Sequence, residues 1–157
     1  MKIKVLAVGK TDDKNLQALI GKYEKRLKHY VGFDMEVIPD VKKAKNLSTE
    51  EQKRLEGESI LKRLQPGDLL VLLDERGKEF RSLGFSDYLQ KKMNAGTRNL
   101  VLVIGGPYGF SEEVYGRANE RISLSRMTFS HQMIRLFLVE QIYRAFTILR
   151  NEPYHHE

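Results

Sequence analysis

Two uninterrupted apolar runs constrain the fold of this chain more than any other feature. Residues 69–73 and 100–104 each hold five aliphatic residues in succession. A strand with one face in solvent alternates polar and apolar residues, so a continuous run is typical of a strand covered on both faces. Parallel strands need crossover connections, which are usually helices. The two runs therefore predict a parallel sheet with helices on both faces.

The remainder of the chain alternates strand and helix signals around these two runs. Apolar residues at helical spacing, with Ser48, Ser86 and Ser111 as capping residues, predict the connecting helices. The further strands are expected over residues 2–8, 33–38 and 122–124, and the helices over 14–30, 48–64, 87–94, 111–119 and 129–149. The 157 residues fit a single domain over 1–157, with an α/β fold and a mostly parallel sheet.

Composition excludes several classes of site. The chain has no cysteine, which excludes disulfides, thiolate zinc sites, iron–sulfur clusters and a cysteine nucleophile. No apolar run approaches the ~18 residues that cross a bilayer. The apolar run at the start is short and interrupted by lysines, which does not fit a signal peptide. We therefore expect a cytoplasmic protein without a membrane segment.

The positive charge is clustered. Lysine and arginine number 27 against 21 acidic residues, a formal net charge of +6. Clusters of this kind suit the phosphate backbone of a nucleic acid, although a solvated basic surface is the simpler alternative. The two densest clusters are Lys22, Lys25, Arg26 and Lys28, and then Lys42, Lys43 and Lys45.

The last predicted helix, residues 129–149, is apolar on nearly every side. Such a helix must be covered on nearly every side. In a chain of this length the sheet covers one face, so we predict a homodimer in which a second subunit covers the other. Burial of the whole helix within one chain is the alternative.

Three segments of unusual composition follow predicted strands, at residues 72–77, 104–109 and 124–129. Ligands of open parallel sheets bind beyond the carboxyl ends of the strands. The second segment, Gly105 to Gly109, matches neither the P-loop nor the dinucleotide-binding pattern, and it could be only a tight turn. The third has apolar side chains and free backbone groups that suit a flat heteroaromatic ring.

Polar residues near the C-terminus are further candidates. Tyr154 and His155 could reach an active site, where a histidine suits proton removal from a heterocyclic N–H, but a frayed end is favoured by spacing alone. The two adjacent histidines lack the third ligand of a zinc site, so no metal site is predicted. His131, one turn into the last helix, is expected to be structural. Glu140 and Arg144 are most simply an intrahelical ion pair, with an interface or RNA role as the alternative.

Taken together, six motifs occur in an order similar to that of the RlmH (YbeA-like) methyltransferases of the SPOUT class. The similarity covers essentially the whole chain. The motifs are Ala7-Val8-Gly9-Lys10, Leu73-Asp74…Gly77, Ile104-Gly105-Gly106-Pro107…Gly109, Leu124-Ser125…Met127-Thr128-Phe129…His131-Gln132…Arg135, Glu140-Gln141…Tyr143-Arg144-Ala145 and Pro153-Tyr154-His155.

The resemblance implies an S-adenosylmethionine-dependent enzyme that methylates N3 of a pseudouridine in 23S ribosomal RNA. It also implies a homodimer, a C-terminal trefoil knot and no metal. The cofactor-binding positions that it implies are Leu73, Gly105, Leu124, Ser125, Arg126, Met127, Thr128 and Phe129.

The same resemblance places Tyr154 and His155 at the target base, and His156 is grouped with them as catalytic. His155 is expected to be the base, or Tyr154 to orient a water or the base edge. His156 departs from the family, which often has arginine or lysine there, and Ser130 stands where proline is frequent. RNA contacts are expected from Lys22, Lys25, Arg26 and Arg144.

Two other functions remain open. One is a non-catalytic factor that binds RNA or the ribosome with the same fold, against which the intact cofactor loops argue. The other is a methyltransferase that acts on transfer RNA. The short chain, without an appended RNA-binding domain, favours a pre-structured target such as the ribosome.

Overall fold

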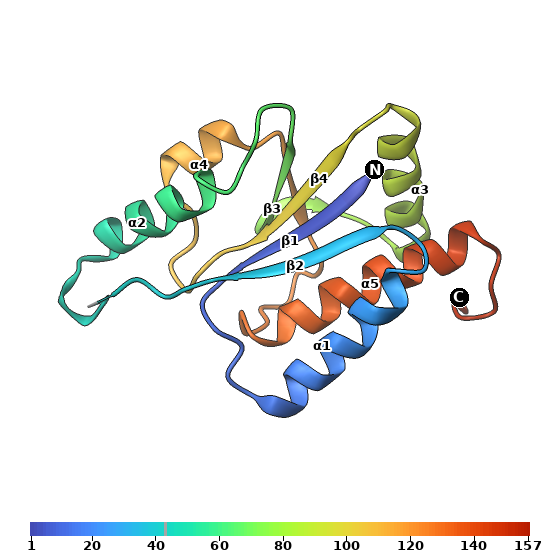
Figure 1. The fold of residues 1–157 in the computed structure, drawn as a ribbon, viewed down its shortest axis with the longest axis horizontal. Coiled ribbons are helices and arrows are strands. Elements are labelled where there is room, and N and C mark those ends of the chain that lie inside the picture. Colours follow the sequence, from blue (N-terminus) through green and yellow to red (C-terminus); the bar gives the residue numbers. More distant parts are fainter. Residues whose placement is uncertain (43) are drawn as a thin grey trace.

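The computed structural model describes residues 1–42 and 44–157 and shows a five-stranded sheet in the order β2-β1-β4-β3-β5 (Figure 1). Every neighbouring pair of strands is parallel, as the apolar runs predict. The apolar runs themselves lie in the central strands β3 and β4. The strands are β1 (Lys2–Val8), β2 (Gly32–Ile38), β3 (Leu69–Glu79), β4 (Asn99–Ile104) and β5 (Glu120–Ser123).

Helices cover both faces of the sheet (Figure 1). One face packs against α1, α3 and α5, and the other against α2 and α4. The helices are α1 (Lys14–Leu27), α2 (Thr49–Leu61), α3 (Ser82–Asn94), α4 (Glu112–Arg117) and α5 (Met133–Leu149), with a short 3-10 helix, η1 (Ala44–Asn46). None of the helices in the described part of the chain has the length and apolar character to cross a membrane.

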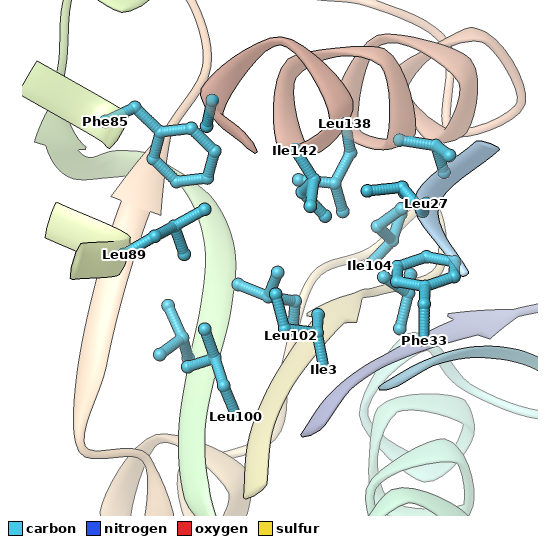
Figure 2. Packing of buried hydrophobic residues seen from close by; sticks show 14 of the residues in the cluster. Ile3, Leu27, Phe33, Phe85, Leu89, Leu100, Leu102, Ile104, Leu138 and Ile142 are labelled. Carbon is cyan, nitrogen blue, oxygen red and sulfur yellow. The ribbon is translucent and has the colours of Figure 1, made fainter. Parts of the chain in front are cut away.

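Alternate residues of the central strands supply the two halves of the core. Ile3, Leu100 and Leu102 lie on the side of the sheet that α3 and α5 cover, in one cluster with Leu89, Leu138 and Ile142 (Figure 2). The residues between them point to the other half, which α2 and α4 cover. Both faces of β4 are therefore buried, which is why its sequence contains no polar residue between Leu100 and Ile104.

Helix α3 begins earlier than predicted. We expected a helix over 87–94 capped by Ser86, but α3 starts at Ser82 and Ser86 lies buried inside it. The Ser86 hydroxyl donates to the carbonyl oxygen of Leu83 at 2.7 Å, so it bonds the preceding turn of the helix instead of capping a new one. The prediction of a Ser86 cap was therefore wrong.

Helix α5 begins later than predicted, at Met133 instead of residue 129. Ser130 ends the preceding loop, because its hydroxyl accepts a hydrogen bond from the Met133 N–H at 3.1 Å. His131 consequently lies before the helix, and the expectation that it sits one turn inside was wrong. Residues 124–132 thus form one continuous loop between β5 and α5.

Candidate active site

The middle of β3 and the carboxyl ends of β4 and β5 border one cavity of about 770 Å³. Leu73 of β3 is level with Ile104, the last residue of β4, and with Ile122 of β5. Strand β3 continues past this level to Glu79 after a register shift between Leu73 and Lys78, so it is longer than the apolar run predicts. A cavity of this volume is within the usual range for small-molecule sites. All eight residues expected to bind the cofactor line it: Leu73, Gly105, Leu124, Ser125, Arg126, Met127, Thr128 and Phe129.

The glycine-rich loop after β4 owes its composition to close packing. A Cβ atom at Gly105 would lie 2.9 Å from the Phe110 ring, and one at Gly106 would lie 2.6 Å from Oε2 of Glu56. Only Gly109 of this loop has a positive φ, of 82°. The tight-turn explanation therefore applies to Gly109, whereas Gly105 and Gly106 let the backbone approach its neighbours.

The carboxyl group of Glu56 lies beneath this loop and is almost fully buried. Burial raises its pKa above the usual value, opposed by a hydrogen bond that Gln52 donates at 3.0 Å. Lys53, on the same helix, lines the cavity itself. Helix α2 thus supports the floor of the site.

The loop from β5 to α5 forms another wall of the cavity. The Ser125 hydroxyl accepts a hydrogen bond from the Met127 N–H at 2.9 Å, and the Ser123 hydroxyl donates to the Ser125 carbonyl at 2.9 Å. Arg126 points outward to Glu79 at 3.1 Å. Apolar side chains and a tightly turned backbone therefore face the cavity, a surface suited to a flat ring.

The C-terminal tail is packed against α5 and is not a frayed end. The Tyr154 hydroxyl donates to Oε1 of Glu140 at 3.0 Å, and its ring meets Tyr143 edge-on at 4.9 Å between centroids. Burial raises the pKa of Tyr154 far above 10, and the hydrogen bonds to Tyr23 and Glu140 add to the shift. Tyr154 is therefore a protonated donor at neutral pH.

The three residues expected to be catalytic do not line the 770 Å³ cavity. His155 lines a second cavity of about 510 Å³, which shares residues 122–125 and Phe129 with the first. Tyr154 lines a third, shallower hollow with Arg26 and Tyr143. His156 is exposed. The structure thus places His155 in a neighbouring cavity that shares residues 122–125 and Phe129 with the first.

A polar chain fixes the position of His155. Arg144 donates to Oε1 of Glu140 from Nη2 at 2.7 Å and from Nε at 3.1 Å, which confirms the predicted ion pair. Its Nη1 lies 3.2 Å from Nδ1 of His155. Glu140 accepts from both Arg144 and Tyr154, so one carboxylate holds both residues.

Comparison with known proteins identifies the family. The family model described as "Predicted SPOUT methyltransferase" matches residues 1–155. The chain belongs to the SPOUT methyltransferase family. Relatives named "Ribosomal RNA large subunit methyltransferase H" are 63% identical in Flavobacterium johnsoniae, 64% in Parabacteroides distasonis and 61% in Bacteroides thetaiotaomicron, each over 100% of both chains.

The SPOUT chain brings together two of the four residues expected to contact RNA. The Arg26 guanidinium lies 5.5 Å from the Tyr143 ring centroid, and that of Arg144 lies 4.8 Å from the Tyr154 ring centroid. The two tyrosine rings touch, so the two arginines flank one aromatic cluster. Lys22 and Lys25 are exposed on α1 beside it.

The second basic cluster is only partly described. Lys42 and Lys45 are exposed in the segment that leads into α2, whereas Lys43 lies outside the described residues. Within residues 1–42 and 44–157, no group of three or more histidine or acidic side chains is placed to hold a metal ion.

Two site residues were quoted in the motifs but given no role, Gln132 and Arg135. Gln132 donates to the carbonyl oxygen of Lys10 at 2.8 Å and accepts from the Asp12 N–H at 3.1 Å. Arg135 is completely buried and donates to Val8 at 2.8 Å. Both tie the loop after β1 to the end of the 124–132 loop. The available signal was an arginine among the apolar residues that begin α5.

Proposed function

We propose that this chain transfers a methyl group from S-adenosylmethionine to N3 of a pseudouridine in 23S ribosomal RNA, in the cytoplasm and on the assembled ribosome. The observation that carries the proposal is the convergence of all eight expected cofactor residues on one cavity. The names of the full-length relatives supply the substrate class, large-subunit ribosomal RNA. The trefoil knot implied by the resemblance belongs to the same proposal.

The residues around the cavity fit S-adenosylmethionine. Leu73 and Leu124 offer apolar contacts to an adenine ring, and Gly105 lines the same cavity. When bound, the cofactor supplies a methyl carbon attached to positively charged sulfur. Orientation of two bound reactants contributes up to roughly 7–11 kcal/mol in favourable cases.

The tail residues Tyr154 and His155 are proposed to face the target base. His155 supports this placement because its cavity shares a wall with the cofactor cavity. Arg26, Lys22 and Lys25 are proposed to hold the RNA backbone beside them, where they form one basic surface of α1. An RNA contact was also expected from Arg144, but its contacts to Glu140 and His155 favour a role within the site.

The test uses large ribosomal subunits that contain the pseudouridine without its methyl group. Incubation with the protein and S-adenosylmethionine should add one methyl group per subunit, located at pseudouridine N3 by mass spectrometry of the digested RNA. Transfer RNA in a parallel reaction should gain none. Binding to the subunits without any methyl transfer would instead support the non-catalytic factor.

A second copy of the chain is proposed to cover the start of α5. The inner face of α5 is already buried against the sheet, α1 and α3, so only part of the helix lacks cover. Phe129, Met133 and Phe137 remain 39%, 41% and 38% exposed, and the two phenylalanine rings touch at 4.9 Å. Exposed apolar side chains that cluster in this way are typical of a protein–protein interface.

Introducing a charge into this patch should convert a dimer to a monomer. Phe137→Lys would place an ammonium group where the partner excludes water, which costs several kcal/mol if the charge stays unpaired. Light scattering at micromolar concentration should report the dimer mass for the parent protein and the monomer mass for the variant. Val37→Lys, at a residue 41% exposed on edge strand β2, is the matched control and should remain a dimer. A parent protein of monomer mass would refute the interface.

A further inference from the structure

The imidazole ring of His155 is held in one tautomer by its neighbour. Nδ1 of His155 lies 3.2 Å from Nη1 of Arg144. A guanidinium group carries only donors and does not lose its proton in proteins, so Nδ1 must be the acceptor. In a neutral imidazole the other nitrogen then carries the hydrogen. The geometry therefore gives His155 an N–H at Nε2 and no free lone pair.

Arg144 is itself fixed on three sides. Its Nη2 and Nε donate to Glu140, and its guanidinium lies 4.8 Å from the centroid of the Tyr154 ring. Tyr154 donates to the same carboxylate. These contacts leave Nη1 directed at His155.

Nε2 of His155 is buried and has no hydrogen-bond partner among the described residues. It is the one buried side-chain nitrogen or oxygen of that part of the chain without a partner. The nearest carboxylate oxygen, Oε1 of Glu157, is 4.0 Å away, beyond hydrogen-bonding distance. A buried donor without an acceptor costs about 1–3 kcal/mol, which points to an acceptor supplied by a ligand.

The cavity that His155 lines holds a single carboxylate. Apart from residues 122–125 and His155 itself, four polar side chains surround this cavity. They are Arg81 and Ser82 at the start of α3, Gln141 on α5, and Glu157. Ser82 and Gln141 are bonded to each other at 3.0 Å. Glu157 is the single carboxylate among them and lies at the exposed end of the tail.

We propose that His155 acts as a hydrogen-bond donor to a carbonyl oxygen of the target base and not as the base that removes its proton. Arg144 and Glu140 are the positioning residues that maintain the Nε2–H tautomer. The proposal deepens the function proposed above and rests on it for the identity of the ligand. The ligand that His155 would bind is an imide, in which a ring N–H lies between two carbonyl groups.

A donor at this position favours the reaction because charge develops on the imide oxygens. The N3 proton leaves to solvent, and the negative charge of the resulting anion spreads to the adjacent oxygens. The N3 lone pair then forms the bond to the methyl carbon, and the sulfur keeps the electron pair of the broken bond. His155 keeps its proton throughout, and its N–H stabilises the anion more than the neutral imide.

The tautomer can be read in the protein alone, without RNA or cofactor. Nitrogen-15 NMR of labelled protein should show a protonated Nε2 and an unprotonated Nδ1 at His155. Arg144→Met removes the donor and should shift the ring toward a mixture of tautomers, whereas Arg144→Lys retains a donor and should preserve the parent signals. A proton on Nδ1 in the parent protein would overturn the proposal.

The methyl transfer rates of His155 variants distinguish a hydrogen-bond donor from a base that removes a proton. His155→Gln places an amide N–H near the position of Nε2 but has no basic nitrogen, so it should keep about a tenth of the methyl transfer rate. His155→Ala and His155→Asn lack a donor at that position and should lose about 100-fold or more, the usual effect of removing one such donor. Equal loss in all three variants would contradict a donor role. A parent protein without methyl transfer would refute the proposed function, and the NMR result would still decide the tautomer.

Discussion

Replacing Gly105 by valine should weaken the binding of S-adenosylmethionine by about 100-fold or more, roughly 2.8 kcal/mol. The cause is steric, because a Cβ atom at this position meets the buried Phe110 ring at 2.9 Å. The ring is held in place by Tyr115, which it meets edge-on at 5.8 Å. The valine side chain must therefore displace either the ring or the loop that forms the cavity wall.

Isothermal titration calorimetry with the cofactor alone measures this effect. Gly116→Ala is the matched control, because a Cβ atom there has nothing within 4 Å. The control should bind like the parent, and circular dichroism should show that both variants are folded. Unchanged affinity in Gly105→Val would place the cofactor elsewhere than in the cavity of the three loops.

The sequence was most informative where one local rule decides the structure. The continuous apolar run of β4 could only be a strand buried on both faces, and both of its faces are buried. Ser48 and Glu51 have the spacing of a capping box, and both of its hydrogen bonds are present at the start of α2. In each case neighbouring residues carry the whole signal.

The predicted starts of two helices were wrong because a serine hydroxyl can make more than one kind of local hydrogen bond. Ser86 can cap a helix or bond back to the turn before it, and only the packing of Phe85 and Leu89 on the sheet decides between them. Ser130 was noted only as a departure from proline. In the structure it accepts the Met133 N–H and so marks the start of α5.

Contacts between residues far apart in the chain could not be read from spacing. Glu56 lies under Gly106 and His155 bonds to Arg144, and no periodic pattern links either pair. The frayed end favoured by spacing was wrong for the same reason, since the tail is held by Tyr143 and Glu140. The eight positions expected to bind the cofactor came from the family resemblance, and the fold brings all of them to one cavity.

Replacing Arg135 by methionine should lower the free energy of unfolding by about 3 kcal/mol or more, because three acceptors lose the donor that satisfies them. Arg135 is fully buried at the start of α5. It donates to Val8 at 2.8 Å, to the Thr11 hydroxyl at 2.7 Å and to the carbonyl of His131 at 3.0 Å. Methionine fills a similar volume but leaves these three acceptors without their donor, at about 1–3 kcal/mol each when they stay buried.

Arg135 also links the stability of the fold to the proposed cofactor site, because it contacts the 124–132 loop. Burial lowers its pKa below the usual value, and Asp40 and Asp12 oppose the shift, so the guanidinium stays charged at neutral pH. Urea denaturation followed by circular dichroism measures the loss. Arg126→Met is the matched control, because that side chain is 87% exposed on the 124–132 loop and should change stability by less than about 0.5 kcal/mol. Because Arg135 binds the carbonyl of His131 at the end of the 124–132 loop, its variant should also bind S-adenosylmethionine more weakly while still folded. Equal stability of the two variants would show that other contacts hold the loop after β1 to α5.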